Sequence, residues 1–225
     1  MDTDAPTTIH FAGRAWTVKT SDAPVGPGPN VFSAANVTVT VTGHLRLAVG
    51  RSPSQPVWTC AEVIAHGTFG YGTYRWTVAS DLTTLDPQVV LGMFTWSDDP
   101  AQAHRELDIE FSRWGRTPEP GGSEPGSGCD PETGGFTVQT PGGPITHTFT
   151  THPGRSEHSL MWTPGRIRFS SRCGNVEHIW THESANVPTP GGGVAPRINL
   201  WLYRGAPAQA PASITIESFR HQPWR

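Results

Sequence analysis

Three acidic residues alternate with three apolar ones in the segment from Glu106 to Phe111. In a strand, successive side chains point to opposite faces, so Glu106, Asp108 and Glu110 would share one face while the apolar residues enter a core. Acidic residues are poor strand formers, and like charges on one face repel one another. Crowding does, however, separate the pKa values of carboxyl groups, so that one keeps its proton while a neighbour stays ionised.

A protonated carboxyl group beside an ionised one can hydrolyse a glycosidic bond, because one protonates the leaving oxygen while the other attacks or activates water. At about 3.3 Å per residue, the α-carbons of Glu106 and Glu110 lie roughly 13 Å apart. Side chains that lean together can close this gap to the ~5–5.5 Å of a retaining pair or leave the wider gap of an inverting pair. The spacing leaves both mechanisms open, as well as a merely solvated acidic face.

The elements around this segment are expected to be strands. Gly and Pro, at 25 and 22 residues, make up about one residue in five, and short apolar stretches rich in Val, Ile, Thr, Phe and Trp lie between turn residues. Strands are expected at residues 37–41, 44–49, 73–79, 89–96, 106–111, 136–139, 157–162, 166–170, 177–180, 197–202 and 213–221. This spacing predicts an all-β fold, a β-jelly-roll sandwich of two antiparallel sheets.

The chain is expected to form a single domain over residues 1–225. Residues 1–30 are rich in proline and are expected to be irregular. Residues 116–135, dominated by Gly, Pro, Ser and acidic residues, are expected to be a long surface loop, and residues 188–196 a shorter one.

Charge and composition exclude several classes of partner. The net charge is −3 and the chain has one lysine, Lys19, so it lacks the positive stripe that nucleic acid requires. No apolar run reaches the 18 residues of a membrane span. The three cysteines, Cys60, Cys129 and Cys173, match no zinc pattern and could form one pair with one free thiol. His178 and His182 fall in a strand-like segment, and we predict no metal there.

The acidic segment resembles the signature of glycoside hydrolase family 16, in which glutamate, aspartate and glutamate alternate with aliphatic residues. Flanking segments resemble the same family in the expected order from about residue 30 to the C-terminus. They are Cys60-Ala61-Glu62, Phe69-Gly70-Tyr71-Gly72-Thr73-Tyr74, Met161-Trp162-Thr163-Pro164-Gly165-Arg166-Ile167 and Arg197-Ile198-Asn199-Leu200-Trp201.

This resemblance implies a concanavalin A-like jelly roll and a retaining mechanism. Glu106 would be the nucleophile, Glu110 the general acid and later the base, and Asp108 would modulate the charge of Glu106. No residue is inserted between Ile109 and Glu110. In this the strand resembles bacterial lichenase-type enzymes that cut mixed-linkage β-1,3-1,4-glucan, rather than the bulged strand of relatives that cut β-1,3 linkages.

Aromatic rings that stack on sugar faces and polar groups that bind hydroxyls are expected around the acids. The candidate substrate-binding residues are Phe94, Trp96, His104, Trp114, Thr137, Gln139, Asn199 and Trp201. The sandwich core is the alternative for each aromatic residue, and we expect Trp76 and Trp162 there. Two departures from the mixed-linkage enzymes leave the glycan open: Val63-Ile64-Ala65 lacks their sugar-binding arginine, and His104 replaces an aromatic residue. His104 and Arg105 could contact the glycan or neutralise the acids.

We therefore expect an endo-acting retaining hydrolase of mixed-linkage or β-1,3-glucan. A non-catalytic lectin-like protein and a transglycosylase of the same glycan class are the alternatives. Catalysis would need no cofactor. Glu217 and Gly43 could hold a structural calcium, as in many relatives, or Glu217 could be an ordinary surface residue. We expect a monomer that binds poly- or oligosaccharide, and a secreted or extracytoplasmic location although no signal peptide is present in the chain.

Overall fold

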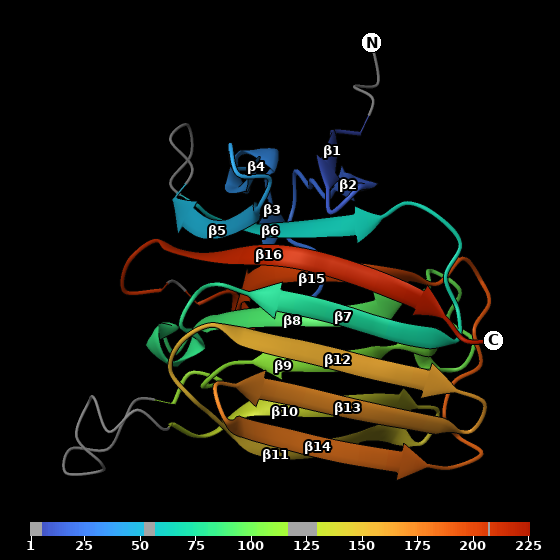
Figure 1. The fold of residues 1–225 in the computed structure, drawn as a ribbon. Coiled ribbons are helices and arrows are strands. Elements are labelled where there is room, and N and C mark those ends of the chain that lie inside the picture. Colours follow the sequence, from blue (N-terminus) through green and yellow to red (C-terminus); the bar gives the residue numbers. More distant parts are fainter. Residues whose placement is uncertain (1–5, 52–56, 117–129, 207) are drawn as a thin grey trace.

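The computed structural model describes residues 6–51, 57–116, 130–206 and 208–225. Two antiparallel sheets lie face to face, as the sequence predicts (Figure 1). The first sheet has the spatial order β11 (Gly143–Thr151), β10 (Asp130–Thr140), β9 (Leu107–Phe111), β8 (Val89–Trp96), β15 (Ala195–Leu202), β6 (Trp58–Ala65), β2 (Arg14–Val18) and β1 (Thr8–Phe11). The second has the order β4 (Val37–Val39), β5 (Leu45–Arg51), β16 (Ala212–Pro223), β7 (Gly72–Val78), β12 (Ser156–Thr163), β13 (Arg166–Cys173) and β14 (Val176–Glu183).

The two sheets are joined at one side, where β5 also pairs with β6 and where β3 (Val31–Phe32) pairs in parallel with β6. Short 3₁₀ turns η1 (Ala34–Asn36), η2 (Leu82–Thr84), η3 (Ala103–Arg105) and η4 (Tyr203–Gly205) complete the regular structure. Within the described ranges, no helix has the length and apolar character to cross a membrane.

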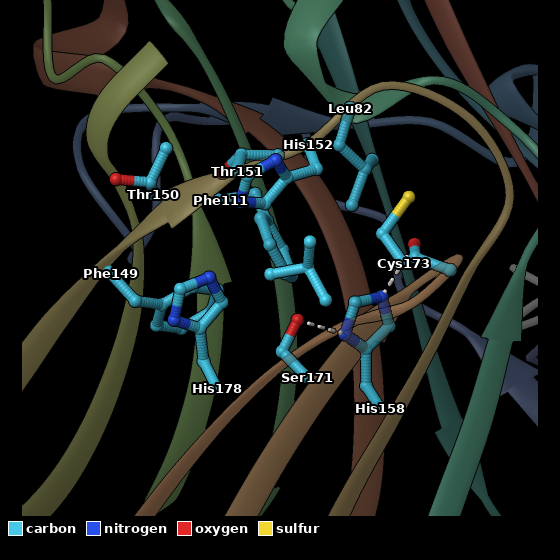
Figure 2. Close-up of a pocket in the computed structure, with 12 residues that line it drawn as sticks. Leu82, Phe111, Phe149, Thr150, Thr151, His152, His158, Ser171, Cys173 and His178 are labelled. Atoms are coloured by element: carbon cyan, nitrogen blue, oxygen red, sulfur yellow. Dashed lines mark hydrogen bonds between the residues drawn. The ribbon is translucent and has the colours of Figure 1, made fainter. Parts of the chain in front are cut away.

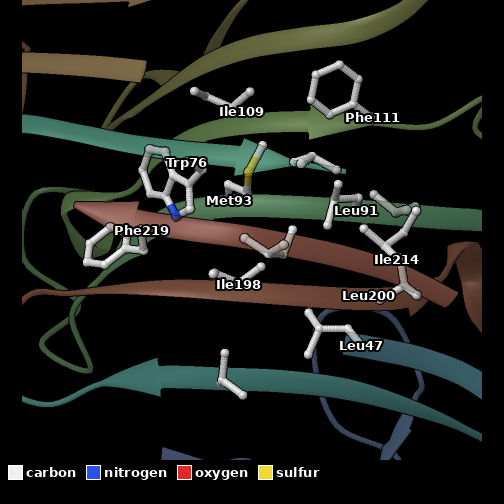
Figure 3. Packing of buried hydrophobic residues seen from close by; sticks show 14 of the residues in the cluster. Leu47, Trp76, Leu91, Met93, Ile109, Phe111, Ile198, Leu200, Ile214 and Phe219 are labelled. Carbon is white, nitrogen blue, oxygen red and sulfur yellow. The ribbon is translucent and has the colours of Figure 1, made fainter. Parts of the chain in front are cut away.

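The core lies between the sheets and receives the apolar face of β9. Leu107, Ile109 and Phe111 are buried there, which confirms the predicted alternation. Side chains of the second sheet, among them Trp76 and Phe219, meet them from the other side (Figure 3). Burying a side chain of this size contributes about 1.5–3 kcal/mol. The two tryptophans expected in the core, Trp76 and Trp162, are both buried.

Several predicted boundaries were wrong. The segment 1–30, predicted to be irregular, contains the hairpin of β1 and β2. The predicted loop at residues 116–135 extends too far toward the C-terminus, because β10 already begins at Asp130. Residues 117–129 of that loop, including Cys129, lie outside the described residues. The predicted list omitted β6, which is buried along most of its length, and β11, a threonine-rich strand with a largely exposed face.

The register of the first sheet aligns its outward-facing residues in rows across the strands. One row runs Gly135, Glu110, Gly92, Asn199 and Glu62, from β10 to β6. The next row runs Thr137, Asp108, Phe94, Arg197 and Ile64. Both partners of β9 pair with it without a register shift, so the strand has no bulge between its acids.

Candidate active site

A cleft of about 410 Å³ opens on the outer face of the first sheet. Its floor is formed by β6, β8, β9 and β15, and Lys19, Gly26 and Pro27 of the N-terminal segment also line it. The residues that line it are Lys19, Gly26, Pro27, Glu62, Phe94, Trp96, Asp98, Glu106, Asp108, Glu110, Arg197, Asn199 and Trp201. The three acids of the sequence motif therefore share one cavity with aromatic and polar side chains.

The pKa values of the three carboxyl groups are all raised. Burial, with a smaller contribution from the charge of Glu106, raises the pKa of Glu110 to about 7. Burial also raises the pKa of Glu106 to about 7, although a hydrogen bond with Asp108 opposes this. The pKa of Asp108 is raised well above its ordinary value by burial and by the charges of both glutamates. The three groups therefore titrate together and share protons among themselves.

Gly92 makes room for Asn199 in the row that contains Glu110. A β-carbon at position 92 would lie 2.4 Å from Oδ1 of Asn199, so any larger residue would displace the amide. Oδ1 is buried and has no hydrogen-bond partner among the described residues. A buried polar atom without a partner is rare, and here it faces a cleft where a ligand hydroxyl can supply the bond.

Trp96 lines the cleft, and the ring of His104 stacks on its indole ring. The two rings stack with centroids 4.1 Å apart and planes 8° apart, and Nδ1 of His104 lies 2.9 Å from the carbonyl oxygen of Ser97. Residues 102–105 all have positive φ, a left-handed turn that costs free energy in residues with side chains. Bonds from Arg105 to Asp99 and to the carbonyl of Ala101 hold this turn. Those bonds direct Arg105 to the turn rather than to the acids.

The other predicted substrate-binding residues divide into two groups. Phe94, Asn199 and Trp201 line the cleft. Trp114, Thr137, Gln139 and His104 are not among its lining residues. The Trp114 ring packs edge-on against Trp201 and Tyr203. The Thr137 hydroxyl lies 3.0 Å from that of Thr146, and Gln139 donates to Oδ2 of Asp108 at 3.4 Å. These four stay predictions as substrate contacts, and Trp114, Gln139 and His104 contact residues that do line the cleft.

Four charged lining residues were not predicted to belong to the site: Lys19, Glu62, Asp98 and Arg197. Glu62 accepts from Lys19 at 3.0 Å and from Arg197 at 3.3 Å. Arg197 also donates to Asp98 at 3.0 Å. Arg197 could have been predicted from Asn199, because it lies two residues earlier in the same strand and therefore on the same face. Lys19 comes from a segment distant in sequence, for which no local pattern exists.

The predicted calcium ligands do not fit a cation well. Gly43 and Glu217 are close in register, because Leu45 pairs with Ile216. The Glu217 carboxylate, however, accepts from Nε of Arg155 at 2.8 Å, so a cation already neutralises it. Within the described ranges, no group of three or more His, Cys, Asp or Glu could hold a metal. The two described cysteines, Cys60 in β6 and Cys173 at the end of β13, are free thiols.

A second cluster of buried polar groups lies between the sheets, around His158 (Figure 2). Its ring nitrogens lie 2.8 Å from Oγ of Ser156 and 3.0 Å from Oγ of Ser171, and its ring contacts Phe111 of β9. Burial lowers the pKa of His158 to about 3, so the ring is neutral. About 10 Å³ remains free there, no more than one water molecule needs. The cluster has no room for a substrate.

Comparison with known proteins identifies the fold. No protein-family model matches the chain, and no curated protein matches it by sequence. Among solved structures, a Bacillus licheniformis β-glucanase is 19% identical over 100% of both chains, with a TM-score of 0.67. A β-1,3-1,4-glucanase (lichenase) from a mouse hindgut metagenome is 18% identical over 96% of both, with a TM-score of 0.66. An immunostimulatory antigen and pseudo β-1,3-glucanase of Mycobacterium tuberculosis is 18% identical over 93% of this chain and 91% of its own, with a TM-score of 0.65. The chain therefore has the β-jelly-roll fold of the family 16 β-glucanases.

Proposed function

We propose that the protein is an endo-acting, retaining β-glycoside hydrolase of a β-glucan. The observation that carries the proposal is the convergence of Glu106, Asp108 and Glu110 from one unbulged strand in an open cleft. Solved structures with the same fold include β-glucanases and a laminarinase, which supports the same class of substrate. Trp96 and Trp201 supply rings on which pyranose faces can stack.

The proposed reaction is a double displacement. A carboxylate oxygen of Glu106 attacks the anomeric carbon while Glu110 donates its proton to the glycosidic oxygen, and the C–O bond to the leaving sugar breaks. Glu110, now ionised, removes a proton from water, whose oxygen then displaces Glu106 from the anomeric carbon. Asp108 shares a hydrogen bond with Glu106 and stabilises its charge as the nucleophile forms and leaves.

The proposed substrate is mixed-linkage β-1,3-1,4-glucan, with β-1,3-glucan second. The regular pairing of β9 with both neighbours supports mixed linkage, given the resemblance of such a strand to lichenase-type enzymes. We also propose that the protein is secreted or extracytoplasmic and that it acts as a monomer.

The test measures release of reducing ends from barley glucan, lichenan and laminarin. We expect cleavage by the native protein and its loss in Glu106→Gln. Proton NMR of the first product should show the β anomer, and a rapid fall in viscosity should show internal cleavage. Absence of cleavage across a broad panel of β-glucans and galactans would remove the proposal.

Carbohydrate binding without turnover is the second candidate, favoured by one observation. A protein with this fold from Mycobacterium tuberculosis is described as a pseudo β-1,3-glucanase, so the fold alone does not guarantee activity. Isothermal titration that shows oligosaccharide binding in a protein without turnover would favour this candidate. Products longer than the starting oligosaccharide would instead indicate transglycosylation, in which a sugar replaces water in the second step.

A further inference from the structure

Arg197 occupies a central place on the cleft floor. It lies on β15, directly across from Phe94 on β8 and from Ile64 on β6. Its side chain is 12% exposed, and its guanidinium carbon lies 5.8 Å from the centre of the Trp96 ring. A planar guanidinium beside an aromatic ring is well suited to bind the hydroxyls of a sugar that stacks on that ring.

The neighbours of Arg197 fix the guanidinium before any ligand arrives. One terminal nitrogen donates to Glu62 and the other to Asp98, at 3.3 and 3.0 Å. Glu62 is itself held by Lys19, whose Nζ also donates to the carbonyl of Gly26 at 2.7 Å. A donor group held in this way loses little conformational entropy when a ligand binds.

The held guanidinium still has an unused donor. Nε of Arg197 is buried and has no hydrogen-bond acceptor among the described residues. Two residues along the same face, Oδ1 of Asn199 is an acceptor without a donor. Their α-carbons are separated by about 6.6 Å at the rise of a strand. A hydroxyl group both donates and accepts, so one pyranose unit with two hydroxyls can satisfy both atoms.

The charges around Arg197 are balanced. Lys19 and Arg197 are cations, and Glu62 and Asp98 are anions, joined as one chain of ion pairs. Among the described residues that line the cleft, no positive charge remains for an anionic ligand, and the carboxyl groups of β9 lie in the same cleft. A glycan that carries carboxylate or sulfate groups would therefore find no free cationic partner there, whereas an uncharged glycan needs none.

We propose that Arg197 determines specificity by donating a hydrogen bond from its guanidinium group to a ring hydroxyl of an uncharged sugar in the cleft. This proposal rests on the proposed function, since it concerns the glycan in the same site. Arg197 takes no part in the proposed double displacement. Its ion pairs with Glu62 and Asp98 would serve to position the guanidinium group for the sugar. The ion pairs hold the guanidinium and leave no free positive charge for an anionic glycan.

The experiment uses Arg197→Met, which removes the donors and keeps most of the side-chain length, and Arg197→Lys, which keeps the charge. Arg220→Met is the matched control, since Arg220 is exposed on β16 of the second sheet. Each variant is measured in turnover and, in a Glu106→Gln background, in binding of a neutral β-glucan tetrasaccharide by isothermal titration. We expect Arg197→Met to weaken binding about 10- to 100-fold, Arg197→Lys to rescue it only in part, and Arg220→Met to leave it unchanged.

A second arm locates the hydroxyl. A series of tetrasaccharides, each with one hydroxyl replaced by hydrogen, is titrated against the Glu106→Gln protein with and without Arg197→Met. One replacement should weaken binding when Arg197 is present and have no further effect when it is absent, as in a double-mutant cycle. Independent effects of every replacement, or tighter binding of an oligosaccharide that contains a uronic acid, would overturn the proposal.

The outcomes separate this inference from the proposed function. Binding that depends on Arg197 in a protein without turnover would support the inference while removing the hydrolase. Turnover that is unaffected by Arg197→Met and Arg197→Lys would keep the hydrolase and remove the inference. Thermal melting of each variant checks the fold, and Arg197→Lys remains as a test if Arg197→Met does not fold.

Discussion

The two faces of β9 contact two clusters of buried ionisable groups that differ in kind. On the outer face, Glu106 and Glu110 have raised pKa values in an open cleft of about 410 Å³. On the inner face, Phe111 contacts His158, whose pKa is lowered to about 3 in a space of about 10 Å³. Burial is the main cause of both shifts. A shifted pKa therefore does not by itself mark an active site here.

What distinguishes the clusters is how fully their polar atoms are bonded. Both ring nitrogens of His158 lie within hydrogen-bond distance of serine hydroxyls. In the cleft, Oδ1 of Asn199 and Nε of Arg197 have no partner among the described residues. The His158 ring is fully bonded without a ligand and stabilises the sandwich, whereas the cleft leaves atoms that a substrate can bond.

The largest expected effect is on activity. Glu106→Gln and Glu110→Gln each remove a group that exchanges a bond or a proton with the substrate. We expect the rate of β-glucan cleavage to fall on the order of 10³-fold or more. Reducing-end assays on lichenan measure it, with circular dichroism to verify folding. Near-native rates in both variants would erase the functional difference between the two clusters.

A substitution in the inner cluster should lower the stability of the fold without affecting the catalytic rate. His158→Ala removes the partner of two buried hydroxyls, Ser156 and Ser171, and leaves a cavity beside Phe111. We expect a loss of about 2–3 kcal/mol in the free energy of unfolding, with a normal catalytic rate per folded molecule. Urea denaturation measures the loss, and His10→Ala, at an exposed position in β1, is the control. A loss of rate without a loss of stability would contradict the structural role of His158.

The proposed catalytic acids should lower the stability of the fold as the pH rises. The folded-state pKa of Glu110 is raised from 4.5 to about 7, so its ionised form is disfavoured in the fold. The cost appears as pH rises through this window and is complete above about pH 7. Glu110→Gln should therefore raise the free energy of unfolding by about 1–3 kcal/mol at pH 8 and leave it nearly unchanged at pH 4. Denaturation at the two pH values measures this, and an equal gain at both would point to a cause other than ionisation.

His158 should have the opposite effect on the pH dependence of stability, because it lowers the free energy of unfolding as the pH falls. The folded-state pKa of His158 is depressed, so the unfolded chain binds a proton first as pH falls below about 6.5. Stability should fall between pH 6.5 and about 3, by at most about 1.4 kcal/mol per pH unit from this residue. The pH dependence of unfolding should be flatter in His158→Ala than in the native protein. Parallel curves would show that His158 is not buried in its neutral form.

The sequence predicted those features that depend on local pattern. Alternation in the segment 106–111 placed the acids on one face and the apolar residues in the core, as found. It failed for β6, whose successive residues are nearly all buried and therefore show no alternation. The ion pairs of Glu62 could not be predicted, because Lys19 and Arg197 lie 43 and 135 residues away in sequence. Side-chain contacts of that range are set by the strand order, which no local pattern encodes.

The place of β15 in the first sheet has a consequence for how the protein folds. This strand, Ala195–Leu202, lies between β8 and β6, so the floor of the cleft closes only when the later part of the chain arrives. Until then β6 and β8 each present an unpaired edge, which is a site for aggregation. Contacts of such long range make folding slow and cooperative. Glycan binding would therefore appear late in refolding and would report that the whole sheet has assembled.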